Sequence, residues 1–360
     1  MENKSKDIVV VGGCGWDCTF YEKEDGTYGL EPDKESPGSK GANQAVGCAR
    51  AGASVKIITT IGDVEKDSFS AKILNNLVRN NIDTTGVWQV RDGLSDVAKI
   101  YVDKDGNNKM DRITGAINEL KPKVLTEVPE NKAMIENAGC VVFQSKMPRE
   151  TYMKLVDMCY ESGVPTVLTP CPFKDLTLNG ENAQENREFL DKVTYITANK
   201  SEALALAGLP ETAEVEEAME ILGNLVVTDG VRGVYFRDEN GVIQNSPALK
   251  ADNIVDKTGA GDAFASYFTA GLVEYGMSMA EAVEFGIKAS TLNIQREGAQ
   301  EGMPTVEEIN TTQFQVEQDT STYVVDNPDL AVGQTPNTSI GQIKPIAASM
   351  EAPDNIMGDN

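Results

Sequence analysis

The sequence predicts an α/β fold with three layers, in which helices flank a doubly wound, mostly parallel β-sheet. Short runs rich in Val, Ile and Thr alternate with amphipathic stretches along most of the chain, and this alternation is typical of βαβ units. A chain of 360 residues with 40% hydrophobic residues is long enough to bury the core of one large domain. Ligands of such folds bind at the carboxyl ends of the strands, so we expect functional residues there.

Eight strands are expected where the apolar runs are short and bounded by turn residues. They cover residues 8–11, 55–61, 97–102, 140–143, 166–168, 195–197, 225–228 and 234–236. Apolar residues at helical spacing predict one helix around Phe69–Leu77 and another around Phe264–Tyr275. Ser278 followed by Glu281 forms a capping box, which predicts the start of a third helix.

Two segments interrupt this alternation. Residues 18–37 are polar and rich in turn formers, and residues 91–112 have the pattern strand, turn, strand with Asp105-Gly106 as the hairpin signal. We therefore expect a small β-sheet, separate from the main one, from about residues 15–38 and 91–115.

The last fifty residues differ from the rest. Between 311 and 360 only Lys344 is basic, whereas seven residues are acidic, and no helical period holds. We predict one domain over residues 1–310, followed by an acidic, polar tail at 311–360 that is disordered or draped over the body. A partner-binding role for the tail stays open.

Composition excludes several classes of function. Lys and Arg number 32 against 56 Asp and Glu, a net charge of −24, which argues against binding to nucleic acid or to a membrane surface. No histidine is present, so histidine bases and His-based zinc sites are excluded. The apolar run at 8–11 is too short for a signal peptide, and no stretch approaches the ~20 apolar residues of a membrane span. Six scattered cysteines form no disulfide framework, so we expect a cytoplasmic protein.

The strongest chemical signal is the segment Asp256–Phe264, DKTGAGDAF. The amides of Gly259, Ala260 and Gly261 can converge at the positive end of a helix, which makes an anion hole. Asp262 beside that hole is placed to take a proton from a hydroxyl that attacks bound phosphate. The alternative is a Gly-rich turn with Asp262 as an N-terminal helix charge.

A second signal is Gly38–Gly52, a glycine loop that runs into a helix of small residues. Small residues let a helix lie close to a sheet, and the loop can bring its backbone close to a ligand. Lys40 and Asn43 supply donors suited to hydroxyl groups. The segment lacks the GxxxxGK[ST] pattern of a Walker A loop.

Together the two segments resemble the signatures of the ribokinase-like (PfkB) carbohydrate kinases, with GANQA closest to ribokinases. The resemblance covers roughly residues 7–310 and includes three further matches: Asn199–Glu202 to the family's NxxE element, Thr228–Gly233 to its nucleotide loop, and Arg296–Gln300 to its cation loop. It implies a ribokinase-like fold whose small β-sheet is a lid that closes over the sugar.

The resemblance also implies ATP as phosphoryl donor, Mg²⁺, and possible activation by K⁺. The sugar would be held by Asp17, Gly38, Lys40, Asn43 and Asp262. ATP would contact Asn199, Thr228, Gly230, Gly233, Gly259 and Gly261. Glu202 would hold Mg²⁺ through water, and a monovalent cation would bind near Asp256, Thr258, Arg296 and Gly298. A homodimer formed through the lid is a further implication.

The sugar pocket departs from the ribokinase pattern at three positions. Gly15 stands where ribokinases have Asn, Ser39 replaces the second glycine of GGKGANQ, and Lys146 puts a positive charge where they have a negative one. We therefore expect a polyol other than ribose, or one with an acidic or otherwise modified group that Lys146 meets. The alternative is a lysine that points to solvent.

A nucleoside or phosphosugar kinase would have the same fold, and a non-catalytic sugar- or nucleotide-binding protein would suit the altered pocket and the tail. A dinucleotide-binding enzyme is disfavoured, because Gly12-Gly13-Cys14-Gly15 lacks the third glycine of GxGxxG.

Overall fold

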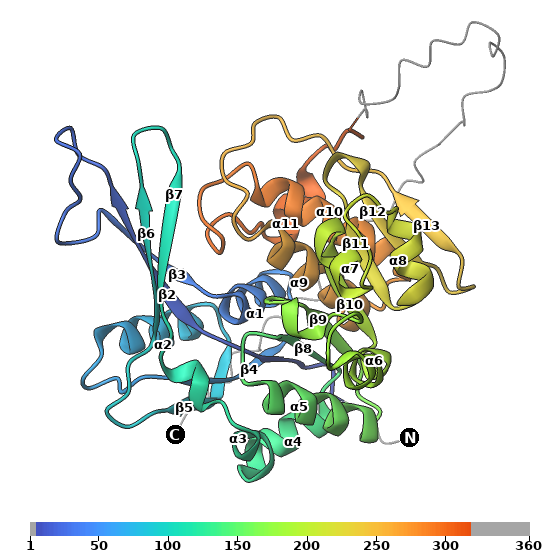
Figure 1. Ribbon diagram of the computed structural model, residues 1–360, viewed down its shortest axis with the longest axis horizontal. Helices are drawn as coiled ribbons and strands as arrows, with labels where there is room; N and C mark the ends of the chain where they lie inside the picture. Colours follow the sequence, from blue (N-terminus) through green and yellow to red (C-terminus); the bar gives the residue numbers. More distant parts are fainter. Residues whose placement is uncertain (1–4, 318–360) are drawn as a thin grey trace, which may run out of the picture.

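The computed structural model describes residues 5–317, and a nine-stranded sheet forms its centre (Figure 1). The strand order is β13-β12-β11-β10-β9-β8-β1-β4-β5, and all neighbours are parallel except for the two pairs at the β13 edge. The strands are β1 Ile8–Val11, β4 Val55–Ile61, β5 Asp83–Gln89, β8 Cys140–Gln144, β9 Thr166–Thr169, β10 Tyr195–Asn199, β11 Leu225–Thr228, β12 Val234–Arg237 and β13 Ile243–Ser246.

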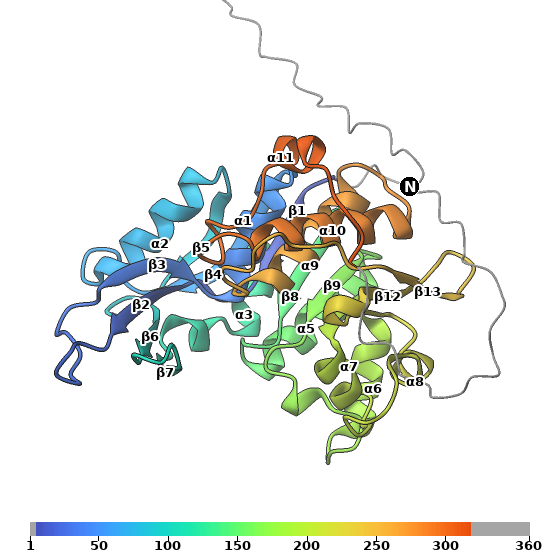
Figure 2. The same cartoon turned by 90° about the horizontal axis from the view of Figure 1, so that it is seen from above.

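Helices cover both faces of this sheet, and each layer has its own apolar core (Figures 1 and 2). One layer consists of α1 Lys40–Arg50, α2 Ser68–Arg79, α9 Ala260–Val273, α10 Met279–Asn293 and α11 Val306–Thr311. The other consists of α3 Pro122–Thr126, α4 Pro129–Asn137, α5 Arg149–Glu161, α6 Ala183–Lys192, α7 Lys200–Leu206 and α8 Val215–Ile221. The three-layer α/β prediction is confirmed.

A separate four-stranded sheet projects from the body beside α2 (Figure 1). Its order is β3-β2-β6-β7, with the strands β2 Gly15–Tyr21, β3 Lys34–Gly38, β6 Asp96–Val102 and β7 Asn108–Ile113. One face packs Cys18, Phe20 and Val97 together, so the strands have a small core of their own. The expected small β-sheet is therefore present.

The eight expected strands all form, and the capping box of Ser278 and Glu281 opens α10. Residues 312–317 run back along the body, where Leu249 and Val316 make an antiparallel bridge. This short stretch lies against the body, and the rest of the predicted tail lies outside the described residues. None of the helices in the described part is long and apolar enough to cross a membrane.

Candidate functional site

The start of α9 lies between two cavities, and glycine is required there. Gly259 precedes the helix with φ 82°, in the left-handed region, and a Cβ on it would lie 2.8 Å from the Cα of Ala299. Ala260 and Gly261 line one cavity, whereas Gly259 and Asp262 line the other. Four consecutive residues are thus divided between the two cavities, two to each.

The amides at this helix start are partly free. Within residues 5–317, the N–H groups of Gly259, Gly261 and Asp262 donate to no protein acceptor. Ala260 differs from the prediction, because its N–H donates to the carbonyl of Lys257 at 3.3 Å. Unpaired amides at a helix N-terminus favour an anion.

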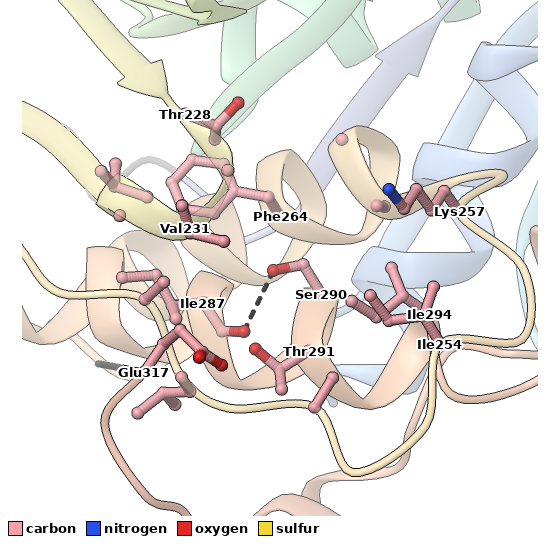
Figure 3. Close-up of a pocket in the computed structure, with 18 residues that line it drawn as sticks. Thr228, Val231, Ile254, Lys257, Phe264, Ile287, Ser290, Thr291, Ile294 and Glu317 are labelled. Atoms are coloured by element: carbon pink, nitrogen blue, oxygen red, sulfur yellow. Dashed lines mark hydrogen bonds between the residues drawn. The ribbon is translucent and has the colours of Figure 1, made fainter. Parts of the chain in front are cut away.

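The first space, which we call the apolar cavity, has a volume of about 350 Å³ (Figure 3). It contains the expected nucleotide-loop residues Thr228, Gly230 and Gly233. Its walls are mainly aliphatic and aromatic side chains that were not predicted from the sequence, namely Val231, Ile254, Phe264, Ile287 and Ile294. An apolar slot of this kind suits a flat ring.

Two charged residues also line the apolar cavity, and they lie at opposite ends of it in Figure 3. Lys257 is next to the helix start and can attract an anion there. Glu317 belongs to the stretch that pairs with residues 248–250, and its N–H donates to the carbonyl of Ala248 at 2.8 Å. The segment 312–317 is therefore part of the cavity wall, which composition alone did not indicate.

The second space, the charged cavity, has a volume of about 440 Å³ and lies between the small sheet and the main body. The expected sugar residues Asp17, Lys40, Asn43 and Asp262 all line it. Gly38 is directly behind Asp17, because a Cβ on it would overlap that carboxylate at 2.4 Å. Burial raises the pKa of Asp17, against the opposing charge of Lys146.

Asp262 is buried, with 3% of its surface exposed, and its carboxylate accepts three hydrogen bonds from α1. Asn43 Nδ2 donates to Oδ2 at 2.9 Å, Gln44 Nε2 to Oδ1 at 3.1 Å, and Lys40 Nζ to Oδ1 at 3.4 Å. The charge of Asp262 raises the pKa of Lys40. These donors fix the direction of the carboxylate at the edge of the charged cavity.

Gln44 was not predicted as a site residue, although it contacts Asp262. Its Nε2 also donates to Thr169 Oγ1 at 2.9 Å, and its Oε1 accepts from Gln144. Helical spacing would have identified it, because Lys40, Asn43 and Gln44 stand at i, i+3 and i+4 and share one face of α1. Gln300 supports the same face through a 3.0 Å bond to Asn43 Oδ1.

Asp256 connects the two segments of the expected cation loop. Its two carboxylate oxygens accept from the amides of Thr258 at 2.8 Å and Gly298 at 3.0 Å. Burial raises the pKa of Asp256, but these hydrogen bonds outweigh it and the pKa lies below its ordinary value. The guanidinium of Arg296 is turned away to Glu308 at 2.8 Å, so only its main chain is left to contribute to this loop.

Asn199 and Glu202 form a capping box at the start of α7. Asn199 Oδ1 accepts from the Glu202 amide at 2.9 Å, and Glu202 Oε2 accepts from the Asn199 amide at 3.0 Å. Burial raises the pKa of Glu202, and the charge of Asp262 raises it further, while the hydrogen bond from the Asn199 amide and the charge of Lys40 lower it. No cluster of three acidic or cysteine ligands occurs within residues 5–317. The other oxygen of Glu202, Oε1, accepts no hydrogen bond from the described residues.

Of the three departures in the sugar pocket, two lie against each other. A Cβ on Gly15 would lie 2.8 Å from the Oγ of Ser39, and Ser39 has φ 72°, in the region that favours glycine. The third, Lys146, follows β8 and lines the charged cavity rather than pointing to solvent. All three departures therefore concern one wall of the same space.

The chain is similar to known proteins over most of its length. The model of the pfkB family carbohydrate kinase matches residues 5–306. The ribokinase of Lactococcus lactis subsp. lactis (strain IL1403) is 35% identical over 275 residues, which cover 76% of this chain and 84% of that protein. The ribokinase of Bacillus subtilis (strain 168) is 32% identical over 310 residues, 84% of this chain and 98% of that protein.

Solved structures show the same fold. Ribokinase from Thermotoga maritima superposes with a TM-score of 0.69 at 29% identity, covering 84% of this chain and 97% of that one. Arabidopsis thaliana ribokinase, complexed with ribose and ATP, has a TM-score of 0.71 at 23% identity and covers 84% and 96%. At that identity the likeness concerns the fold alone.

Proposed function

The chain belongs to the pfkB family of carbohydrate kinases and is a homologue of ribokinases, and we propose that it transfers the γ-phosphate of ATP to a primary hydroxyl of a ribose-like sugar or related polyol. One observation carries this proposal: the start of α9 separates an apolar cavity from a charged one. A donor nucleotide in the first and an acceptor in the second would meet at Gly259–Asp262. Holding both reactants in line supplies much of the catalysis of phosphoryl transfer.

The proposed roles follow from the two sides of this helix start. Asp262 takes the proton of the acceptor hydroxyl. The hydroxyl oxygen then forms a bond to the γ-phosphorus, while the bond between that phosphorus and the bridging oxygen of the β-phosphate breaks. The free amides of Gly259 and Gly261, with Ala260 between them, hold the charge of the phosphoryl group. Asn43, Gln44 and Lys40 keep the carboxylate aimed at the acceptor.

ATP fits the apolar cavity because its base would lie among aliphatic side chains and its phosphates beside Lys257. Thr228, Gly230 and Gly233 would contact the nucleotide there. Mg²⁺ would neutralise the phosphates, with Glu202 holding it through water, since Mg²⁺ dehydrates reluctantly. Thr258 and the 296–298 main chain, fixed by Asp256, would hold a monovalent cation beside the helix start.

The small sheet would act as a lid that closes over the acceptor and excludes water. Asp17 on β2 would accept hydrogen bonds from sugar hydroxyls, with Gly38 leaving room for it. A homodimer through this sheet and a cytoplasmic location stay predictions. A non-catalytic binding protein is the weaker candidate, because a protein without turnover has no need for three donors aimed at Asp262.

Replacing Asp262 by Asn tests the proposed function. We expect turnover of ATP with a sugar panel to fall by about 10²- to 10⁴-fold, the usual contribution of a general base, while calorimetry still detects nucleotide binding. Asp105→Asn, on an exposed turn, is the matched control and should leave turnover unchanged. Full turnover in Asp262→Asn, or no sugar-dependent turnover in the unaltered chain, would contradict the proposal.

A further inference from the structure

A second group of charges lines the charged cavity beyond the proposed sugar contacts. It consists of Asp96 on β6, Arg112 on β7 and Lys146 after β8. The strand register brings Asp17, Ala98 and Arg112 side by side across three strands, and Asp96 lies two residues before Ala98 on the same face. Arg112 and Asp96 therefore face the cavity together with Asp17.

The electrostatic contacts separate this group from the transfer end. Lys40 interacts mainly with Asp262, whereas Lys146 and Arg112 both oppose the rise that burial causes in the pKa of Asp17. Lys146 is also the one charged group that opposes the burial-raised pKa of Asp96. The elements agree with this division. Asp262 lies on α9 and is hydrogen-bonded to α1, whereas Asp17, Asp96 and Arg112 lie on neighbouring strands of the small sheet.

Asp96 has an unused acceptor at this second end. Its side chain is 4% exposed, its Oδ2 accepts from the amide of Ile117 at 3.1 Å, and its buried Oδ1 has no hydrogen-bond partner in the described part of the chain. A buried carboxylate oxygen of this kind needs a donor, and a hydroxyl of a bound polyol supplies one.

The two cations at this end also have unused donors. The ion pairs formed within residues 5–317 include neither Lys146 nor Arg112. In the part of the chain that the structure describes, the guanidinium of Arg112 donates only to the sulfur of Met110, at 3.1 Å. One cation comes from the small sheet and the other from the main sheet, so an anion held between them would bridge the two parts of the cavity wall.

We propose that the acceptor carries an oxyanion, a carboxylate or a phosphate, at the end remote from the reacting hydroxyl, and that Lys146 and Arg112 bind it while Asp96 accepts from a neighbouring hydroxyl. This inference rests on the proposed kinase function and names the class of its acceptor. Neither cation forms a direct ion pair within residues 5–317, so a neutral sugar would leave both without a charged acceptor in contact once the cavity closes and water is excluded. An oxyanion takes donors from both cations at once.

The experiment compares acceptors that share one reacting hydroxyl. D-ribose and ribitol are neutral, D-ribonate adds a carboxylate and ribose 1-phosphate adds a phosphate, and all four keep the C5 primary hydroxyl. With the full chain and ATP, we expect kcat/KM for one of the two anionic acceptors to exceed that for ribose by about tenfold or more. The better of the two distinguishes carboxylate from phosphate.

Variants of Lys146 and Arg112 test whether these two cations cause the preference for the anionic acceptor. In Lys146→Met and in Arg112→Ala, the ratio of kcat/KM for the anionic acceptor to that for ribose should fall by about tenfold. Lys109→Ala is the matched control, because this lysine is also on β7 but its side chain is 80% exposed. Thermal unfolding of each variant shows whether it is folded.

Two results would overturn the inference in distinguishable ways. If ribose or ribitol is the best acceptor and Lys146→Met leaves the ratio unchanged, the oxyanion is wrong but the kinase function stands. If none of the four acceptors is phosphorylated and none alters ATP turnover, the proposed function itself fails for this acceptor class and the inference fails with it.

Discussion

Ser39 has a backbone conformation that residues with a side chain rarely adopt, at φ 72° and ψ 139°. Its hydroxyl makes no capping hydrogen bond to α1. The hydroxyl occupies part of the space that a side chain on Gly15 would need, since a Cβ there would lie 2.8 Å from Ser39 Oγ and 2.9 Å from the Asp96 carbonyl oxygen. Two of the three departures from the ribokinase pattern therefore lie against each other, with strain at residue 39.

Ser39→Gly should relieve that strain. A side chain in such a region costs about 1–3 kcal/mol, and the added freedom of glycine in the unfolded chain removes about 0.5–1 kcal/mol. We expect a net gain of about 1 kcal/mol, which raises the Tm by roughly 1–2 °C in a domain of this size. Ser36→Gly, in strand β3, should lower the Tm instead. Equal shifts in thermal unfolding for both variants would contradict the account.

Roles in the site could be predicted from the sequence for residues that belong to a recognisable motif. The residues that the resemblance assigns to the sugar include Asp17, Lys40, Asn43 and Asp262, and all four line the charged cavity. Gln44 and Lys257 were not assigned roles, because the first needs the helical face to be traced and the second needs the cavity on the far side of α9 to be known. Tertiary packing decides which acceptor a buried donor meets, and a local sequence pattern does not predict that packing.

At the scale of the element, the two glycines at the start of α9 have different tasks. Gly259 is required by its positive φ and by the closeness of Ala299. Gly261 is in the helix, and a Cβ on it would have no atom within 4 Å, because it faces the apolar cavity. One glycine serves the fold, and the other leaves space for a ligand.

Alanine at each glycine should therefore give opposite results. Gly259→Ala should lower the free energy of unfolding by about 2 kcal/mol or more, from left-handed strain and the clash. Gly261→Ala should keep or raise it by about 0.5–1 kcal/mol, because alanine favours helix over glycine. Yet in Gly261→Ala the kcat/KM for ATP should fall about tenfold, because the methyl group displaces the phosphates. Urea unfolding and ATP kinetics measure both; a Gly261→Ala enzyme with unchanged kinetics would place the nucleotide elsewhere.

Helices and strands could be predicted where an apolar run or a capping motif indicates them. The capping box of Ser278 and the runs of the inner strands are of this kind. Strands β5 and β13 were missed because they lie toward the edges of the sheet, where the segments DTTGVWQ and IQNS are half exposed and carry no apolar run. A strand held mainly by its neighbour's backbone leaves little trace in its own sequence.

At the scale of the whole molecule, the site depends on contacts between distant segments. Asn43 and Asp262 are 219 residues apart, and Asn43 and Gln300 are 257 apart. Close packing of α1 on α9 brings them together, since a Cβ on Gly47 would lie 2.5 Å from the Oγ of Ser266. The motifs indicated which segments matter, but the distances between them exist only in the assembled fold.

The net charge of −24 acts on the molecule as a whole. Folding brings like charges closer together than in the unfolded chain, so their repulsion lowers the free energy of unfolding. Salt should reduce this effect, because the Debye length shrinks from about 30 Å at 0.01 M to about 10 Å at 0.1 M. We expect the Tm to rise by roughly 1–2 °C over that range, which is about 1 kcal/mol. If screening is the cause, sodium chloride and potassium chloride should raise the Tm equally. A larger rise of the Tm with potassium chloride would instead indicate that K⁺ binds at the loop that Asp256 fixes. A Tm that falls with both salts would show that attractive ion pairs outweigh the repulsion.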